Sequence, residues 1–262
     1  PLRCACAVRA GGADVFVSAE PVGAVDAVIS RISPSASAHS LAVLRQFELG
    51  GAYCLNRSEP TARGRDKLRT LQLLASRGIG VAPTGLAHHP DDVRDVVERL
   101  GGPPVIVKLV DGTQGAGVAL AESVTAAQSI VEALQAAHRN VLVQAFVPHD
   151  SDARLFVVGG QVVAAMRRYA RFGNFRANLH QGGVAEALKP SDAQRDAAVA
   201  AAVGLGLEMA GVDLLDGPSG PVILEVNASP GLEGIEAASG RNVAGSIVRF
   251  LEARVRENEP AR

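Results

Sequence analysis

The segment Leu224-Glu-Val-Asn-Ala-Ser-Pro-Gly-Leu-Glu-Gly-Ile-Glu236 is the most informative part of the chain. Its first four residues alternate apolar and polar side chains, as in a half-buried β-strand, so Glu225 and Asn227 point to the same face. A second apolar strand is predicted upstream around Asp213, and the Asp216-Gly217 dipeptide after it predicts a hairpin. This hairpin would bring Asp213 opposite Glu225 and Asn227.

The three side chains form a predicted metal site. Two carboxylates and an amide oxygen are the hard oxygen ligands that Mg²⁺ prefers, and substrate phosphates and water complete its octahedron. Burying acidic residues within apolar strands is costly unless a cation compensates their charge. The alternative is that Glu225 faces water at a strand end and Asn227 caps a turn. The further carboxylate of Asp213 favours the metal site.

A predicted phosphate site lies upstream of this hairpin. Lys108 ends an apolar strand, and the loop Asp111-Gly-Thr-Gln-Gly-Ala-Gly117 follows it. Glycines let backbone N–H groups approach a phosphate closely. The loop is not a P-loop, since no Gly-Lys-Ser/Thr follows, and a strand rather than a helix is predicted after it, unlike a dinucleotide fingerprint. An ordinary turn is the alternative, and Lys108 favours a phosphate lid.

A basic segment begins at the end of the predicted strand 161–168 and continues beyond it. It comprises Arg167, Arg168, Arg171, Arg176, Asn178 and His180. Such a cluster is either a solvated face or a group of cations that neutralises a triphosphate and a developing acyl phosphate. No serine or cysteine stands at motif spacing beside His180, so the sequence does not indicate a nucleophilic catalyst.

The remaining pattern predicts interleaved helices and strands. Helices are expected where apolar residues recur at helical spacing, at 41–49, 61–77, 91–100, 123–138, 191–207 and 241–257. Strands are expected at 22–32, 53–55, 104–110, 117–121, 140–146, 154–158, 161–168, 212–215 and 222–226. Because two of the turns are hairpin signals, the sheets are not purely parallel. We therefore predict an α+β fold, with several small α/β modules around a cleft.

Composition limits the class of protein. The 262 residues are 47% hydrophobic and carry a net charge of −1, so a general polyanion-binding surface is not indicated and no nucleic-acid partner is expected. The three cysteines lack the number and spacing of a disulfide framework or zinc site. No segment approaches the roughly 20 apolar residues of a membrane span, and the first ten residues lack the core of a signal peptide. We therefore expect a cytoplasmic protein.

Taken together, these motifs resemble the ATP-grasp superfamily, and specifically the RimK-type amino-acid ligases. The resemblance runs from about Val25 to Leu251. Besides the opening segment, it rests on Ala42-Val-Leu-Arg-Gln-Phe-Glu48, Arg65-Asp-Lys-Leu-Arg69, Val107-Lys-Leu-Val-Asp-Gly-Thr-Gln-Gly-Ala-Gly117, Phe175-Arg-Ala-Asn-Leu-His180 and Ala210-Gly-Val-Asp213. It implies an ATP-grasp fold at 61–257, with a central subdomain and phosphate lid at 61–143 and a C-terminal metal and substrate subdomain at 144–257. A shortened preATP-grasp α/β domain at 1–60 would precede it.

The resemblance also implies the roles of individual residues. Lys67 and Lys108 would contact the phosphates of ATP, and Asp152 would hold the ribose hydroxyls. The hinge that reads adenine would be Gln144, Ala145 and Phe146. The lid would include Gly112, Gln114, Gly115 and Gly117. Near the γ-phosphate and acyl phosphate would lie Arg176 and Asn178. Ala177 would also contact the nucleotide, and Arg167, Arg176 and Asn178 would be catalytic. Two Mg²⁺ (or Mn²⁺) ions would be held by Asp213, Glu225 and Asn227.

The implied reaction is amide-bond formation through an acyl phosphate. A ligase that adds glutamate or a similar amino acid to a protein C-terminus, such as that of a small-subunit ribosomal protein, is the leading interpretation, and a homo-oligomer is expected. The alternatives are a ligase acting on a cofactor or carrier protein, and a nucleotide-binding module without ligase activity. Three departures from the family pattern are Ala145 in place of glutamate, Gln181 in place of arginine, and 1–19 in place of the usual first strand and helix.

Overall fold

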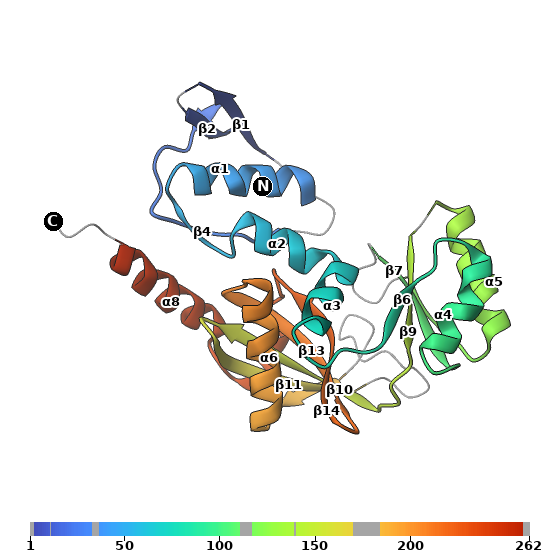
Figure 1. The fold of residues 1–262 in the computed structure, drawn as a ribbon. Coiled ribbons are helices and arrows are strands. Elements are labelled where there is room, and N and C mark those ends of the chain that lie inside the picture. Colours follow the sequence, from blue (N-terminus) through green and yellow to red (C-terminus); the bar gives the residue numbers. More distant parts are fainter. Residues whose placement is uncertain are drawn as a thin grey trace.

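The computed structural model describes residues 3–10, 12–32, 37–110, 117–138, 140–169 and 184–258. Helices and strands are interleaved along these ranges, and the strands within them form four sheets (Figure 1). Three of these sheets are antiparallel, and one pair of strands is parallel. The predicted α+β fold is therefore confirmed. Within the described ranges, no helix is both long and apolar enough to cross a membrane.

The N-terminal part combines an antiparallel meander with a parallel strand pair. The meander consists of β1 (Cys4–Arg9), β2 (Gly12–Val17) and β3 (Glu20–Pro21). The parallel pair consists of β4 (Ala27–Ile29) and β5 (Tyr53–Leu55), joined through α1 (Ser37–Leu49). The strand expected at 22–32 is therefore much shorter than predicted, because only three of its residues have a partner strand.

A four-stranded sheet with two helices on one face forms the part drawn in green in Figure 1. In sheet order its strands are β6 (Thr84–Leu86), β9 (Val141–Ala145), β7 (Val105–Leu109) and β8 (Val118–Ala121). The helices are α4 (Val93–Arg99) and α5 (Val124–Ala136). Small aliphatic side chains such as Val107, Val143, Val97 and Val131 form the core between the sheet and the helices.

A five-stranded antiparallel sheet forms the C-terminal part. In sheet order its strands are β12 (Val184–Ala187), β11 (Gln161–Tyr169), β10 (Ser151–Val158), β13 (Met209–Gly217) and β14 (Gly220–Asn227). Its helices are α6 (Asp192–Leu205), α7 (Glu233–Ser239) and α8 (Val243–Asn258). Leu155 and Val157 pack in the core with α6, whereas Phe156 and Val158 pack in the core with α7 and α8. Strand alternation thus buries both faces of this sheet.

The helix expected at 61–77 is in fact two helices, α2 (Ser58–Arg65) and α3 (Lys67–Ala75). The break lies at Asp66, whose backbone is extended and whose carboxylate accepts the N–H of Arg69 at 3.0 Å. An aspartate at a helix start satisfies a backbone donor that has no partner inside the helix. Periodicity alone did not locate the break, because the apolar stripe lies wholly within α3 and α2 has none of its own.

Three further expectations need correction. The helix expected at 91–100 begins with a 3₁₀ turn, Pro90–Asp92, that is capped by His89, and its α-helical part is only Val93–Arg99. The C-terminal hairpin turns between Gly217 and Gly220, after the predicted Asp216-Gly217, because both strands extend further than expected. Helix α7 was not predicted, because its seven residues are too few for a helical period to stand out.

Candidate active site

The hairpin of β13 and β14 brings the predicted metal ligands together. Its register places Asp213 directly opposite Glu225, and Gly211 opposite Asn227. The register shifts just beyond this pair, where Leu224 is an extra residue on β14. A β-bulge of this kind re-aims the side chains that follow it. The bulge turns Glu225 to the Asp213 face, while Val226 joins the core on the α6 side.

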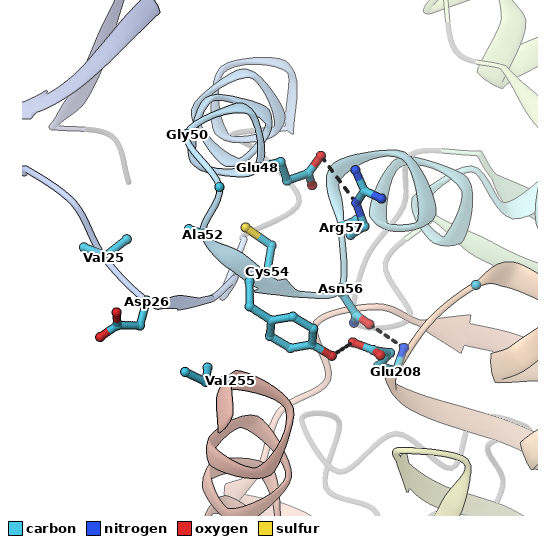
Figure 2. A pocket seen from close by; sticks show the side chains of 13 residues that line it. Val25, Asp26, Glu48, Gly50, Ala52, Cys54, Asn56, Arg57, Glu208 and Val255 are labelled. Carbon is cyan, nitrogen blue, oxygen red and sulfur yellow. Dashed lines mark hydrogen bonds and ion pairs between the residues drawn. The ribbon is translucent and has the colours of Figure 1, made fainter. Parts of the chain in front are cut away.

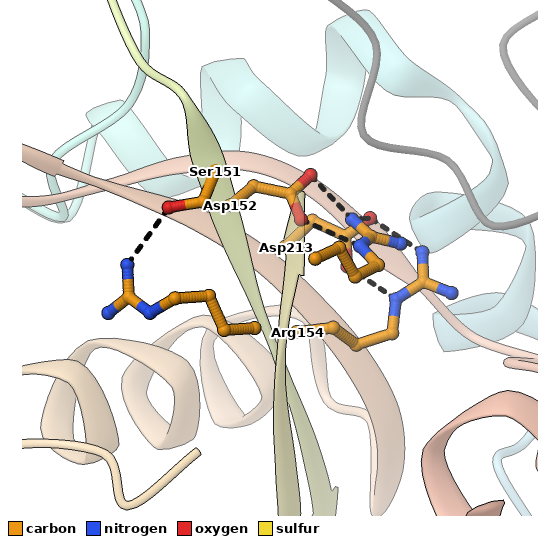
Figure 3. Close-up of polar contacts among 6 residues, drawn as sticks. Ser151, Asp152, Arg154 and Asp213 are labelled. Atoms are coloured by element: carbon orange, nitrogen blue, oxygen red, sulfur yellow. Dashed lines mark hydrogen bonds and ion pairs between the residues drawn. The ribbon is translucent and has the colours of Figure 1, made fainter. Parts of the chain in front are cut away.

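The Asp213 carboxylate is buried in a network of arginines (Figure 3). Arg154 on β10 donates two hydrogen bonds to it, each 2.6 Å long. Arg168 on β11 lies 3.0 Å from Asp213 and forms a second bidentate pair with Asp152, at 2.6 and 2.7 Å. All four side chains lie on one face of the five-stranded sheet. This network was not predicted, although the Asp-x-Arg spacing of 152 and 154 places both side chains on one strand face.

Burial and charge act in opposite directions on these groups. Burial by itself would raise the pKa of Asp213, but the charges and hydrogen bonds of Arg154 and Arg168 outweigh it and lower that pKa to about 2. Burial raises the pKa of Asp152 more than Arg168 lowers it. For Arg168, burial lowers the pKa, but the two carboxylates outweigh it and raise the pKa above its ordinary value. Asp213 is therefore held as an anion inside the sheet.

The donor chemistry of Asp213, Glu225 and Asn227 fits a hard cation. Glu225 and Asn227 are half-buried at the end of β14, beside the Asp213 anion. In the described part of the chain, no three His, Cys, Asp or Glu side chains cluster closely enough to hold a metal by themselves. A bound ion would therefore depend on the Asn227 amide oxygen and on oxygens of the substrate phosphates.

Two lysines approach this site from the other elements. Burial lowers the pKa of Lys108 to about 8; the charge of Glu225 raises that pKa and the charge of Lys67 lowers it further. Lys67 Nζ donates to the carbonyl oxygen of Leu109 at 3.4 Å. Lys67 starts α3, Lys108 lies on β7 and Glu225 lies on β14. The site is thus assembled from three parts of the chain.

The lid and the basic segment are only partly described. Gly117 has a φ of 70°, a conformation that glycine adopts readily. Outside the described residues lie Gly112, Gln114, Gly115, Arg176, Ala177 and Asn178, together with Arg171, His180 and Gln181. Their predicted roles stay predictions.

The predicted hinge lies at the carboxyl end of β9, which runs between β6 and β7. The N–H of Ala145 donates to Pro83 at 2.8 Å, and the N–H of Phe146 donates to Pro104 at 3.2 Å. The buried Gln144 side chain donates to Thr84 at 2.7 Å. In this conformation both N–H groups are occupied, so adenine would have to use other backbone groups of the hinge.

Asp152 and Arg167 have partners that bear on their predicted roles. Both oxygens of Asp152 accept from Arg168, yet each keeps a lone pair for a ribose hydroxyl. Arg167 donates to Ser151 at 3.1 Å and lies 3.6 Å from Asp216. Because neighbouring strand residues point to opposite faces, Arg167 lies on the α6 side of the sheet, away from Arg168. It pairs with Asp216 of β13, but on the opposite face of the sheet from the predicted metal ligand Asp213.

A separate pocket of about 630 Å³ lies at the amino ends of β4 and β5 (Figure 2). Tyr53 donates a hydrogen bond to Glu208 across it, and Arg57 pairs with Glu48 at its rim. Burial, followed by the hydrogen bond to Glu208, raises the pKa of Tyr53 to about 12. None of the predicted ligase residues lines this pocket, so it lies apart from the candidate active site.

Comparison with known proteins covers nearly the whole chain. A family model described as the RimK-like ATP-grasp domain matches residues 64–251, and one described as the RimK PreATP-grasp domain matches residues 1–60. A probable alpha-L-glutamate ligase of Vibrio parahaemolyticus serotype O3:K6 is 47% identical over 259 residues, covering 98% of this chain and 86% of that protein. A protein of the same description from Halorhodospira halophila is 49% identical over 254 residues, covering 96% and 84%.

The fold is also similar to solved structures. The ATP-grasp ligase PsnB, solved in complex with a minimal precursor, Mg and ADP, superposes with a TM-score of 0.74 at 25% identity. The match covers 98% of this chain and 86% of PsnB. The expected architecture, an ATP-grasp fold preceded by a preATP-grasp region, is thereby confirmed.

Proposed function

The chain belongs to the RimK-like ATP-grasp family and is an ATP-dependent ligase, and from this premise we propose that it adds glutamate to the C-terminus of a protein or peptide acceptor, such as a small-subunit ribosomal protein. The observation that carries the proposal is the meeting of Asp213, Glu225 and Lys108 in one site. Anionic groups that hold a metal and cations that hold phosphates are the parts that phosphoryl transfer requires.

The proposed reaction has two steps. An oxygen of the acceptor carboxylate attacks the γ-phosphorus of ATP, the bond to the bridging oxygen breaks, and ADP leaves. The amine of glutamate then attacks the acyl carbon, phosphate departs with the bonding electron pair, and the amine loses a proton. Atoms balance as one amide, one ADP, one phosphate and one proton. The protein mainly positions charge, as in other phosphoryl transfers.

Residues of this chain have distinct parts in this scheme. Lys67 and Lys108 would hold the phosphates, and Asp213, Glu225 and Asn227 would hold Mg²⁺, two ions in the proposed complex. Bound Mg²⁺ would neutralise charge on the transferred phosphoryl group. Arg154 lies beside Asp213 and keeps that carboxylate ionised, so Asp213 could bind a metal ion without first losing a proton.

The substrates are proposed from the relatives. Proteins about 48% identical over nearly the full length are named probable alpha-L-glutamate ligases, which supports glutamate. PsnB was solved with a precursor, which supports a peptide acceptor. The alternatives are a cofactor or carrier-protein acceptor, and nucleotide binding without turnover.

ADP release measured in the presence and absence of glutamate and of each candidate acceptor tests the proposal. We expect release to require both substrates, and mass spectrometry to show the acceptor extended by glutamyl residues. If only a cofactor or a carrier protein is extended, the protein is a ligase for that class of acceptor and the proposed protein C-terminus is wrong. Tight ATP binding without any glutamate-dependent turnover would contradict the ligase.

The Glu225→Ala variant tests the metal site. We expect Mg²⁺-dependent ADP release to fall by at least about a hundredfold, since a ligand of the phosphate-bound cation is lost. The circular dichroism spectrum should be unchanged, because Glu225 is only half-buried. Glu252→Ala, on the exposed face of α8, is the matched control and should retain activity. Full activity of Glu225→Ala would exclude this carboxylate as a ligand.

A further inference from the structure

The segment that follows β4 is hydrogen-bonded to the loop that follows β14. Ser229 Oγ donates to the carbonyl oxygen of Ser30 at 3.1 Å and accepts the N–H of Ile32 at 3.2 Å. Arg31 lies between the two hydrogen-bonded residues, Ser30 and Ile32. The segment 30–32 is therefore held against the end of the metal strand by hydrogen bonds on both sides of one arginine.

The Arg31 guanidinium lies beside this loop. Its Nη1 donates to the carbonyl oxygen of Pro230 at 2.6 Å, three residues beyond Asn227. No carboxylate in the described part of the chain forms an ion pair with it, and desolvation lowers its pKa. The side chain is nevertheless exposed, and one carbonyl occupies few of its five N–H donors. Arg31 thus presents a positive charge and unused donors next to the metal strand.

A second arginine reaches the same segment from α2. Arg65 Nη1 lies 3.5 Å from the carbonyl oxygen of Ile32, and desolvation also lowers the pKa of Arg65. Two residues later Lys67 begins α3 and contacts the end of β7. The cations Arg31, Arg65 and Lys67 therefore lie in one region, from the loop after β14 to the end of β7.

The two proposed substrates place different charges in this region. The phosphates of ATP would be neutralised by Lys67, by Lys108 and by the Mg²⁺ that the metal ligands hold. The attacking amino acid must present an uncharged amine, yet it carries carboxylates that need a cation when they leave bulk water. Arginine matches a carboxylate with two parallel hydrogen bonds, whereas a lysine offers only a point charge.

We propose that Arg31, assisted by Arg65, binds a carboxylate of the amino acid whose amine attacks the acyl phosphate. The inference rests on the proposed ligase function and assigns the amine-side substrate to the joint between β4 and the loop after β14. Arg31 would orient this substrate by its carboxylate, and the hydrogen bond to Pro230 would keep the guanidinium in place.

Steady-state kinetics of Arg31→Gln test this assignment. We expect KM for glutamate to rise about 10- to 100-fold, the loss typical of one hydrogen-bonded charge pair. The KM for ATP and for the acceptor should stay within about twofold of wild type. Arg31→Lys should recover only part of the loss, because lysine cannot form the bidentate pair. Arg94→Gln, on the exposed face of α4, is the matched control and should behave as wild type.

A substrate analogue separates binding from a merely structural role. Wild type should strongly prefer glutamate to its α-amide or to glutamine, and Arg31→Gln should lose preference against one of the two. A variant that is slower but keeps both preferences would overturn the assignment, as would a rise in acceptor KM in place of glutamate KM. Calorimetry with glutamate, ADP and Mg²⁺ gives a readout without turnover. If wild type turns over and Arg31→Gln binds glutamate normally, the subsite is wrong and the ligase stands; if wild type neither turns over nor binds glutamate, both are wrong.

Discussion

The Asp213 carboxylate shows how this site holds charge inside a sheet. It is 5% exposed and accepts bidentate hydrogen bonds from Arg154, with Arg168 beside it. A buried charge is costly alone, but removing one partner from a buried pair costs more than the pair contributes, because the other charge is left uncompensated. Asp213 is therefore important to stability as well as to the proposed metal site.

The Asp213→Asn variant should lower the free energy of unfolding by about 3 kcal/mol at neutral pH, by analogy with other broken buried pairs. The folded-state pKa is about 2, below the ordinary 3.8, so the contribution is complete above pH 3.8 and is lost as the pH falls toward 2. Urea titrations of both proteins should therefore converge across that window. Asp192→Asn, 95% exposed, is the control. A pH-independent difference would contradict the ionised state.

Lys108, a proposed phosphate contact, is destabilised by burial of its charge. Its folded-state pKa of about 8 lies below the ordinary 10.5, so the unfolded chain binds the proton more tightly. Wild-type stability should therefore rise as the pH increases from 8 to 10.5. Lys108→Met, which removes the charge but keeps the length, should stabilise the unliganded protein by about 2 to 3 kcal/mol at pH 7 and weaken ATP binding severely.

Thermal unfolding with and without ATP–Mg²⁺ would measure both effects of Lys108→Met. The melting temperature of the unliganded variant should be higher than that of wild type, and its rise on adding nucleotide should be much smaller. An unliganded variant less stable than wild type would contradict the desolvation of Lys108.

At the scale of secondary structure, the break between α2 and α3 positions Lys67, the residue proposed to contact the phosphates. Asp66 caps α3 through the N–H of Arg69, and Thr70 Oγ1 donates to the carbonyl oxygen of Arg63 across the break at 2.9 Å. These bonds set the angle at which α3 starts, and Lys67 is its first residue. The bulge at Leu224 has a similar effect in β14, where it turns Glu225 toward Asp213.

The Asp66→Ala variant should lower the free energy of unfolding by about 1 kcal/mol, the usual cost of losing a helix cap. Asp66→Ser keeps a cap acceptor and should lose only a few tenths of a kcal/mol. Denaturant titration of the three proteins gives the comparison. Equal destabilisation by both substitutions would show that the hydrogen bond to Arg69 is not the cause.

At the scale of the whole molecule, Asn56 joins the N-terminal strand pair to the C-terminal sheet. Its amide nitrogen donates to Met209 at 2.6 Å and to Ala228 at 2.8 Å. Its amide oxygen accepts from Glu208 at 2.8 Å and from Met209 at 3.0 Å. Asn56 is 1% exposed, and its φ of 58° is one that asparagine tolerates. Every hydrogen-bonding position of this side chain is used.

The Asn56→Gly variant should lower the free energy of unfolding by about 3 to 5 kcal/mol, because several buried backbone groups lose their partners while the unusual φ stays permitted. Hydrogen exchange should accelerate first at the N–H groups of Glu208 and Met209. The Asn56→Ala variant should be less stable still, since alanine adds the strain of a positive φ. Unchanged exchange at the amides of Glu208 and Met209 would show that Asn56 does not hold the strand pair to the C-terminal sheet.

Local pattern accounts for much of the structure. Helices α1, α5 and α6, capped in two cases by Ser123 and Ser191, follow from apolar spacing and cap residues. Strands β5, β7, β9, β10 and β11 follow from apolar runs and turn signals. The break at Asp66 was missed because apolar periodicity does not detect a cap residue, although an aspartate before the first leucine is itself a local start signal. Helix α7 was missed because it is short.

The sequence by itself determined the α+β class, the family resemblance and the shared strand face of Glu225 and Asn227, because alternation and motif spacing are local properties of the chain. Only the tertiary structure decided that Arg154 and Arg168 surround Asp213, that Arg167 faces away, and that Lys108 approaches Glu225. These contacts join residues far apart in the chain, and they depend on strand order, the bulge at Leu224 and the packing of separate sheets, which no local pattern specifies.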